Sequence, residues 1–221
     1  MDAGLALRIA VCLVVAYLLG AVPWSLVIGK RFYHTDVREH GSGNLGATNV
    51  LRVLGWKAAL ATFVLDVAKG VVAVGVAWWL VDTATYGPLA NEWAMIGATF
   101  AAIAGHSYSA YIGFTGGKGV ATAAGGLLVL TPLAWPVLLV SWIIVFAIWR
   151  IVSLGSVVIA VEFPLLVVLL YPGDVPRITL AVLAAGLVIW RHSANIRRIV
   201  RGQEPRLSLS GTTSTRQKGG S

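Results

Sequence analysis

The sequence predicts an all-α integral membrane protein that crosses the bilayer seven times, with its N-terminus outside and its C-terminus inside. Of its 221 residues, 57% are apolar and only 12% are charged. A soluble domain carries about 25% charged residues, so this chain has too little charge to cover a water-exposed surface. Long apolar runs alternate with short polar segments, and such runs are the pattern of membrane-spanning helices.

Six of the runs are long enough for a full membrane helix, which needs about 20 mainly apolar residues. They cover approximately residues 5–29, 56–81, 92–112, 133–149, 153–171 and 177–192. The first run is too long for the apolar part of a signal peptide and has no clear cleavage site before Lys30, so we interpret it as a retained helix.

A seventh apolar run, at 118–131, is shorter and contains glycine. It could span the membrane with help from flanking residues, or enter it as a re-entrant segment. We favour a span, because Thr131-Pro132 then marks the turn into the next helix.

The distribution of Lys and Arg predicts the orientation, because cytoplasmic loops of membrane proteins are enriched in both. If the N-terminus lies outside, 14 of the 17 basic residues fall on inside segments, Arg8 and Arg177 lie outside, and Lys69 lies within a run. An outside N-terminus and an inside C-terminus require an odd number of spans, which agrees with seven. The net charge of +8 also fits anionic lipid or an anionic substrate.

A single polytopic domain is expected over residues 1–207. The segment 208–221 is rich in Ser, Thr and Gly and has no apolar periodicity. This composition predicts a disordered cytoplasmic tail.

The sequence Gly116-Gly117-Lys118-Gly119 lies directly before the short apolar run. Glycines let successive backbone N–H groups converge on an anion, and the helix N-terminus behind them adds positive potential. The Lys118 ammonium would add a charge on a phosphate. The spacing is not that of a P-loop, and the alternative is a flexible turn with one interfacial lysine.

A second polar segment lies between the first two long runs and contains Ser42, Asn44 and Arg52. Arg52 lies one turn beyond Thr48, so its guanidinium could point back to the loop and bind a phosphate in bidentate fashion. The alternative is that Arg52 binds no substrate and only reflects the enrichment of Lys and Arg in cytoplasmic loops. Ser42 and Asn44, and more so Thr48 and Asn49, could instead cap the next helix.

The third polar segment begins at Arg191 and ends at Glu204. His192 and Asn195 are three residues apart, so we expect them on one helix face, where they could orient and deprotonate a hydroxyl. The alternative for His192 is amphipathic packing at the interface. For Glu204 we expect a structural role, satisfying a backbone group of its loop.

Charged residues within the apolar runs are costly unless paired. Asp66 and Lys69 are three residues apart and are expected to pair with each other. Together with Glu162 they motivate an alternative function, a small transporter of a phosphorylated or lipid anion. Against transport, the polar motifs gather in loops on one face rather than in mid-membrane. A purely structural membrane subunit would leave the Gly-Lys and His-Asn segments without a role.

Taken in order, the three polar segments resemble the PlsY family of acyl-phosphate-dependent glycerol-3-phosphate acyltransferases. Its first motif, S-G-N-P-G-A-T-N, is similar to the stretch from Ser42 to Asn49, and its third, R-H-x-x-N-I-x-R-x-x-x-G-x-E, to the stretch from Arg191 to Glu204. The second, G-H followed by G-G-K-G-V-A-T, is similar to Gly105-His106 and to 116–122. The chain departs at Leu45 (usually Pro), Tyr108-Ser109 (often Phe-Pro) and Thr115 (often Lys).

The resemblance implies transfer of a fatty acyl group from acyl phosphate to the 1-hydroxyl of sn-glycerol 3-phosphate, which gives lysophosphatidic acid and phosphate in an early step of phospholipid synthesis. It implies no metal and no cofactor. It also implies a multi-pass protein of the bacterial cell membrane, with its active site facing the cytoplasm. The expected partners are these substrates, membrane lipid and an acyl-phosphate-synthesising enzyme, and no nucleic acid.

The residue roles follow from the same resemblance. Acyl phosphate would lie on Lys118 and the backbone of Gly116, Gly117 and Gly119. Glycerol 3-phosphate would be held by Arg52 with Ser42 and Asn44, and its hydroxyl oriented by His192 and Asn195. Ser153 or Ser156 would add a donor to the carbonyl or phosphate. Whether His192 or a substrate phosphate takes the proton is left open.

Overall fold

The computed structural model describes residues 2–207 of the chain, and the predicted tail at 208–221 lies outside the described residues. Within the described part, the secondary structure is helical apart from one isolated β-bridge between Ser109 and Thr115. The helices are α1 (Ala3–Ala21), α2 (Trp24–Tyr33), α3 (Ala47–Leu54), α4 (Trp56–Leu80), α5 (Thr83–Ser107), η1 (Ala110–Ile112), α6 (Val120–Leu130), α7 (Ala134–Trp149), α8 (Val152–Leu170), α9 (Val175–Arg191) and α10 (Ser193–Val200).

Each predicted apolar run corresponds to a helix, although the first one is interrupted. The chain breaks at Val22-Pro23, so the run expected at 5–29 becomes α1 followed by α2. Proline has no backbone N–H and its ring clashes with the preceding turn, which explains the break. The run expected at 92–112 is α5, which starts earlier and ends at Ser107. In the polar segments, α3 and α10 are separate short helices of eight residues each, for which no bounds were predicted.

Three stretches are long and apolar enough to cross a membrane: Ala3–Tyr33, which joins α1 and α2, Trp56–Leu80 and Val152–Leu170. A fourth results if α9 and α10, which are bent by 63° relative to each other, form one broken span. Helices α6 and α7 are apolar but shorter. Together with the family assignment below, these spans describe an all-α integral membrane protein.

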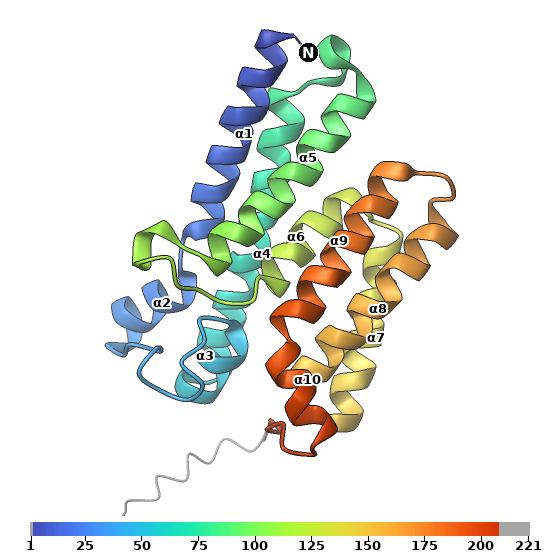
Figure 1. Ribbon diagram of the computed structural model, residues 1–221. Coiled ribbons are helices and arrows are strands. Elements are labelled where there is room, and N and C mark those ends of the chain that lie inside the picture. The colour runs from blue at the N-terminus through green and yellow to red at the C-terminus, as the bar shows by residue number, and fades with distance from the viewer. Residues whose placement is uncertain (1, 208–221) are drawn as a thin grey trace, which may run out of the picture.

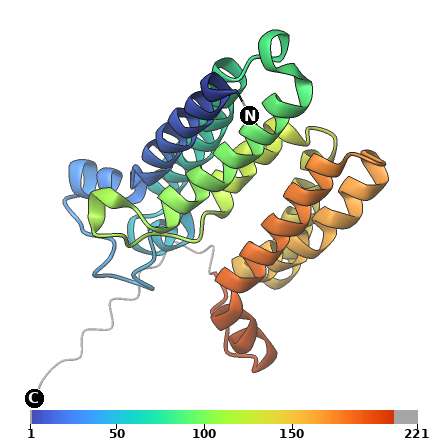
Figure 2. The same ribbon diagram turned by 45° about the horizontal axis from the view of Figure 1, so that its top comes forward.

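The helices form two side-by-side groups, which are visible in both ribbon views (Figures 1 and 2). Helices α1, α4, α5 and α6 make up one group, and α7, α8 and α9 the other. A cluster of buried apolar side chains joins the groups and includes Val74, Leu130, Leu138, Phe163 and Leu180. The groups are therefore packed together through a shared core.

Glycines let two helix pairs in the first group approach at backbone distance. A Cβ added at Gly20 of α1 would lie 2.1 Å from the carbonyl oxygen of Ala102 in α5, and one at Gly125 of α6 would lie 2.1 Å from that of Val67 in α4. Small residues at such crossings are typical of membrane helices. These contacts fix the end of α5 and the start of α6, between which the Gly-Lys segment lies.

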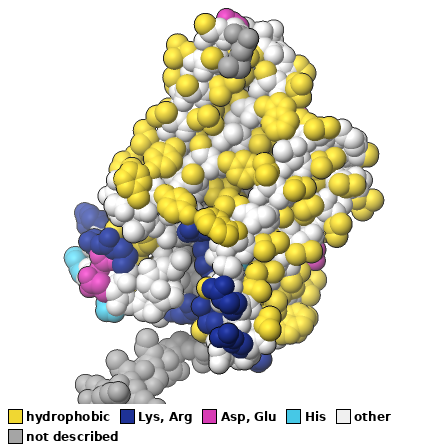
Figure 3. Space-filling view, viewed as in Figure 1, with side chains coloured by type: hydrophobic (Ala, Val, Ile, Leu, Met, Phe, Trp, Pro, Cys, Tyr) yellow, Lys and Arg dark blue, Asp and Glu magenta, His cyan; other side chains and the backbone are white. Residues whose placement is uncertain are grey.

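The surface is mostly apolar, as expected for a protein in contact with lipid (Figure 3). Lys and Arg side chains gather at one end of the molecule, on both sides of a hollow in the surface (Figure 3). In the ribbon view this end holds α2, α3 and α10 (Figure 1). All three predicted polar segments reach this end.

Candidate active site

A chain of hydrogen bonds joins three segments that are far apart in the sequence. The ammonium of Lys118, just before α6, donates to Asn195 Oδ1 on α10. Asn195 Nδ2 donates to Glu204 Oε1 at 2.5 Å. Ser153, in the first turn of α8, donates its hydroxyl to the same Glu204 oxygen at 2.6 Å. Three of the predicted site residues therefore meet in one network.

Glu204 is the centre of this network and was assigned the wrong contacts from the sequence. It was expected to satisfy a backbone group, but its carboxylate accepts bonds from the side chains of Ser153, Asn195 and Arg198, the last at 2.7 Å. Burial raises the pKa of Glu204, but these three donors outweigh it and hold the pKa below the usual value. Glu204 is therefore a carboxylate at neutral pH.

Lys118 lies in a half-buried, positively charged environment. Burial, together with the neighbouring guanidinium groups of Arg198, Arg191 and Arg52, lowers the pKa of Lys118 to about 8, against the opposing effect of Glu204. Arg52 belongs to the last turn of α3, and in the common view of Figures 1 and 3 the helices α3 and α10 lie on opposite sides of the hollow. The concentration of cations around one lysine makes a site for an anion with more than one negative charge.

The Gly-Lys segment is fixed to the end of α5 by its backbone. The Gly117 N–H donates to the carbonyl oxygen of His106 at 3.1 Å. A Cβ at Gly116 would lie 2.1 Å from that same oxygen, so only glycine allows the approach. The Gly117 N–H is thus already bonded, and the predicted use of the Gly117 N–H for an anion does not fit this arrangement.

The N–H groups on either side of Gly117 are differently placed. Among the described residues, the N–H groups of Gly116, Lys118 and Gly119 donate no backbone hydrogen bond. Gly119 is the N-cap of α6, with φ +78°, and no side chain caps this helix start. The positive end of α6 therefore adjoins Lys118, which is the arrangement that favours an anion.

Arg191 holds the same segment from the opposite side and was not assigned a role from the sequence. Its Nη2 donates to the Gly117 carbonyl oxygen at 2.6 Å and its Nη1 to the Tyr108 hydroxyl at 3.1 Å. The guanidinium also lies over the Tyr108 ring, 5.2 Å from its centroid. The signal for this role was the Arg that begins the third motif, together with Tyr108 at a position where the chain departs from the family.

His192 lies between α9 and α10, which are bent by 63° relative to each other, and it is the N-cap of α10. Asn195 follows three residues later on α10, and both side chains are buried. His192 Nδ1 lies 2.8 Å from the carbonyl oxygen of Val188. A carbonyl only accepts, so Nδ1 carries the proton and Nε2 is left with a free lone pair.

The first polar loop is organised by Asn49, which is buried on α3. Asn49 Oδ1 accepts bonds from the Ser42 backbone N–H at 2.8 Å and from its hydroxyl at 3.1 Å. Asn49 Nδ2 donates to the carbonyl oxygens of Val37 and His40. Asn44 Oδ1 accepts from the Gly46 N–H at 2.9 Å. The alternative that these residues cap the next helix is wrong, because the N-cap of α3 is Gly46 and no side chain bonds this helix start.

The structure therefore brings together some predicted residues more closely than others. Lys118 bonds Asn195 directly, Ser153 is joined to Asn195 through Glu204, and Arg52 acts on Lys118 through its charge. Among the described residues, the side chains of Ser42 and Asn44 bond only within their loop and to α3. Ser156 donates to the Val152 carbonyl oxygen of its own helix at 3.2 Å.

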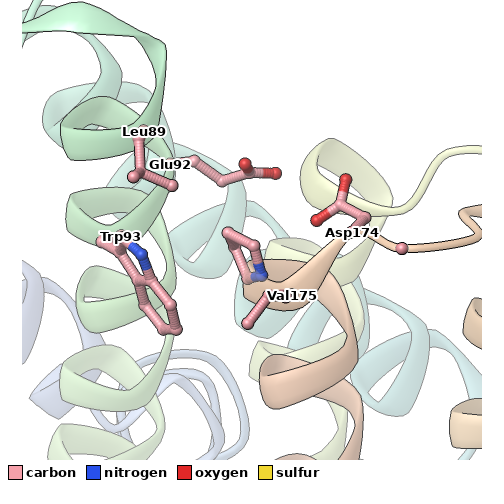
Figure 4. A pocket seen from close by; sticks show the side chains of 7 residues that line it. Leu89, Glu92, Trp93, Asp174 and Val175 are labelled. Atoms are coloured by element: carbon pink, nitrogen blue, oxygen red, sulfur yellow. The ribbon is translucent and has the colours of Figure 1, made fainter.

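Two cavities lie among the described residues. One, of about 70 Å³, is apolar and lies between α6, α7, α8 and α9, with Val120, Ser156 and Val188 among its lining residues. The other, of about 450 Å³, lies between the start of α5 and the loop before α9 (Figure 4). There Glu92 and Asp174 both pair with Arg177. This second cavity is at the opposite end from α3 and α10 and contains none of the predicted site residues.

The sequence of this chain matches a known protein family. The family model described as glycerol-3-phosphate acyltransferase matches residues 10–202. A glycerol-3-phosphate acyltransferase of Listeria monocytogenes is 43% identical over 192 residues, which are 87% of this chain and 93% of that protein. One of Gloeobacter violaceus is 41% identical over 195 residues, covering 87% and 91%.

Solved structures agree with the sequence relatives. The crystal structure of PlsY, an integral membrane glycerol 3-phosphate acyltransferase, in its glycerol 3-phosphate form matches with a TM-score of 0.79 and 33% identity, over 90% of this chain and 96% of that one. Its lysophosphatidic acid form gives 0.77 and 32%, over 90% and 95%. Because the family model covers nearly all the helices, the first two motifs and all but the end of the third, the chain belongs to the glycerol-3-phosphate acyltransferase family, of the PlsY type.

Proposed function

We propose that this protein transfers a fatty acyl group from acyl phosphate to the 1-hydroxyl of sn-glycerol 3-phosphate. The observation that carries the proposal is the meeting of Lys118, Asn195 and Ser153 in one network, with Arg52, Arg191 and Arg198 around Lys118. Both substrates carry a phosphate, and such a cluster of cations beside a helix N-terminus suits two phosphates close together. The family assignment supports the same reaction.

Acyl phosphate is assigned to the start of α6. Lys118 would bind its phosphate, helped by the backbone N–H groups of Lys118 and Gly119 and by the positive end of the helix. Asn195 would hold the Lys118 side chain in place, since both of its amide atoms are already bonded within the network. Ser153, fixed by Glu204, and Ser156 lie at the next helix start, where a donor to the carbonyl or phosphate is expected.

Glycerol 3-phosphate is assigned to the opposite wall of the hollow. The exposed guanidinium of Arg52 would bind its phosphate, with Ser42 and Asn44 contributing from the loop before α3. Asn49 fixes the Ser42 backbone and hydroxyl, so this loop is preorganised. The two phosphates would then lie on two sides of one site.

The reaction needs no covalent intermediate, because an acyl phosphate is already activated. The hydroxyl oxygen of glycerol 3-phosphate attacks the acyl carbonyl carbon, an ester C–O bond forms, and the bond from carbon to the phosphate oxygen breaks. The phosphate leaves with its electron pair, and lysophosphatidic acid remains. The hydroxyl proton goes either to the free Nε2 of His192 or to a substrate phosphate.

The apolar cavity between α6, α7, α8 and α9 supports a place for the acyl chain. Val120 and Ser156, which line it, belong to the first turns of α6 and α8, next to Lys118 and Ser153. An acyl chain entering this cavity would leave its phosphate at the helix starts. The charged and apolar parts of one amphipathic substrate are thus matched by neighbouring parts of the site.

We also propose how the protein lies in the membrane. Seven spans over a single domain at 1–207, an outside N-terminus and an inside C-terminus would place the site at the cytoplasmic face of a bacterial cell membrane. The gathering of Lys and Arg at the site end supports this orientation (Figure 3). A cysteine-labelling scan with a membrane-impermeant reagent tests it: cysteines at the Arg52 end must be protected in intact cells and labelled after permeabilisation.

The enzymatic proposal is tested with purified protein, labelled glycerol 3-phosphate and palmitoyl phosphate. Formation of labelled lysophosphatidate with release of phosphate is expected. Uptake into vesicles without product would instead support a transporter of a phosphorylated or lipid anion, which the family match does not favour. A donor-synthesising enzyme is proposed as partner, and its co-purification with this protein in mild detergent would support the pairing.

A further inference from the structure

A buried polar cluster lies behind the Gly-Lys segment and has no role in the proposed reaction. Asp66 and Lys69 of α4 form an ion pair of 2.9 Å, as the sequence predicted, and both side chains are almost fully buried. Lys69 also lies 2.9 Å from His106 Nδ1, near the end of α5. Its third neighbour is the Val22 carbonyl oxygen, at 3.1 Å, in the break between α1 and α2.

The three neighbours of Lys69 determine the state of His106. A lysine ammonium has three N–H donors and no acceptor. One of them goes to the Val22 carbonyl oxygen, while the Asp66 carboxylate is an ion-pair partner, 2.9 Å from the ammonium and 3.6 Å from His106 Nδ1. Because the ammonium has no lone pair, the shorter contact of 2.9 Å between Lys69 and His106 Nδ1 requires Nδ1 to accept. The proton of the neutral imidazole therefore resides on Nε2.

The other side of the His106 ring faces the Gly-Lys segment. A Cβ added at Gly117 would lie 2.2 Å from His106 Nε2, so the ring is in contact with the backbone of this glycine. The main chain of His106 accepts the Gly117 N–H as well. His106 thus contacts Gly117, next to Lys118, with both its backbone and its ring.

We propose that His106 is a positioning residue for the acyl-phosphate segment, held in a single ring orientation and tautomer by the buried Asp66–Lys69 pair. The inference rests on the assignment of acyl phosphate to Gly116–Gly119 under the proposed function. The ion pair sets Nδ1 as an acceptor, and the ring in turn supports the backbone that carries Lys118. A buried charge pair is a costly way to stabilise a membrane helix, and this role accounts for its presence.

The tautomer is testable without any variant that could fail to fold. The wild-type protein is labelled with nitrogen-15 histidine and its imidazole resonances are recorded in detergent micelles. His106 is identified by the resonance that the His106→Asn variant lacks. A pyridine-like Nδ1 with a protonated Nε2 is expected. The opposite tautomer, or rapid exchange between the two, would overturn the proposal even if acyl transfer itself is normal.

Kinetics test the coupling to the segment. Asparagine at 106 keeps an acceptor where Nδ1 is and removes Nε2. Asp66→Leu with Lys69→Met removes the ion pair without leaving one buried charge alone. Each change is expected to raise KM for palmitoyl phosphate ~10-fold, about the effect of one hydrogen bond, with kcat nearly unchanged. The variant that combines both changes should have nearly the same KM for palmitoyl phosphate as either change alone, because both act through the His106 ring.

The control is Gly75→Ala, on the same helix α4, where an added Cβ meets no atom within 4 Å. It should leave KM for both substrates unchanged. An unchanged KM for palmitoyl phosphate in folded His106→Asn would refute the positioning role of His106. So would a combined variant whose increase in KM is the product of the two separate increases. If the wild-type protein shows no acyl transfer, the proposed function is wrong, and the nitrogen-15 measurement still tests the His106 tautomer.

Discussion

Ser153 and Glu204 lie 51 residues apart in the sequence and share a hydrogen bond of 2.6 Å, from the serine hydroxyl to Glu204 Oε1. The same carboxylate oxygen accepts a hydrogen bond from Asn195 Nδ2, and Asn195 Oδ1 accepts one from the Lys118 ammonium. Glu204 thus determines where three side chains of the proposed site lie. A change at Glu204 is therefore expected to act on the reaction through its neighbours.

Glu204→Gln is predicted to lower kcat/KM for acyl phosphate by roughly 10- to 100-fold. Glutamine has one acceptor oxygen and no charge, so Ser153, Asn195 and Arg198 can no longer all be satisfied. Steady-state kinetics in detergent measure the effect. Glu39→Gln, at an exposed position, is the matched control. Wild-type kinetics in Glu204→Gln would show that the network does not position the site.

Lys118→Ala and Arg52→Ala are predicted to abolish or strongly reduce acyl transfer without unfolding the protein. Lys118 is held to the site by Asn195, and Arg52 contributes charge from the opposite wall. The two variants should differ in the substrate whose binding is weakened: acyl phosphate for Lys118→Ala and glycerol 3-phosphate for Arg52→Ala. Substrate titrations with each partner in excess separate the two. Normal activity in either folded variant would contradict its assignment.

The sequence predicted the helices better than the contacts of the site. A membrane helix is recognised from its own apolar run, so most of the long helices followed from local composition. The break at Pro23 was missed although proline itself disfavours a continuous helix. The bounds of the short helices α3 and α10 did not follow from composition, because their stability depends on neighbouring elements. Glu204 was misassigned for the same reason, since its partners include Ser153 on another helix.

The bend at His192 shows the second limit of sequence reasoning. An apolar run predicts a helix but not the residue at which the helix bends. Here the chain bends by 63° between α9 and α10, at His192, whose imidazole bonds the Val188 carbonyl oxygen. The direction from which α10 brings Asn195 to Lys118 depends on this kink, which no letter pattern specifies.

The rate of the reaction with acyl phosphate is predicted to fall as the pH rises through about 8. Burial lowers the pKa of Lys118 to about 8, and only its cationic form attracts a phosphate. Below this pH the lysine is charged and kcat/KM is constant. Above it, kcat/KM falls towards tenfold per pH unit, since it reports ionisation in the free enzyme.

Lys118→Arg is the control for this pH profile. Arginine stays protonated throughout the measured range, so the decline near pH 8 should disappear even if the overall rate is lower. Both proteins meet the same substrates, so any ionisation of the substrates would appear in both profiles. A wild-type profile that stays flat up to pH 10 would exclude Lys118 as the group that binds the anion in its charged form.

His192→Ala is predicted to lower kcat by ~100-fold or more if its Nε2 takes the hydroxyl proton, the scale typical of general base catalysis. Because Nδ1 is bonded to Val188, Nε2 is the only ring nitrogen able to accept. His192→Asn is the informative companion, since its amide N–H could still donate to Val188 while nothing replaces Nε2. If both variants only raise KM for glycerol 3-phosphate, a binding role remains and the proton goes to a substrate phosphate.

Arg191→Lys is predicted to raise KM for acyl phosphate about tenfold, although it keeps the charge. Arg191 bridges the Gly117 carbonyl oxygen and the Tyr108 hydroxyl with two separate nitrogens and stacks on the Tyr108 ring. A lysine can make one of these contacts but lacks the planar fork that makes both. Tyr108→Phe removes only the hydroxyl and keeps the ring, so it should have a smaller effect. If Arg191→Lys matches wild type while Arg191→Ala does not, charge alone accounts for the residue, and the fork geometry is irrelevant to how the segment holding Lys118 is placed.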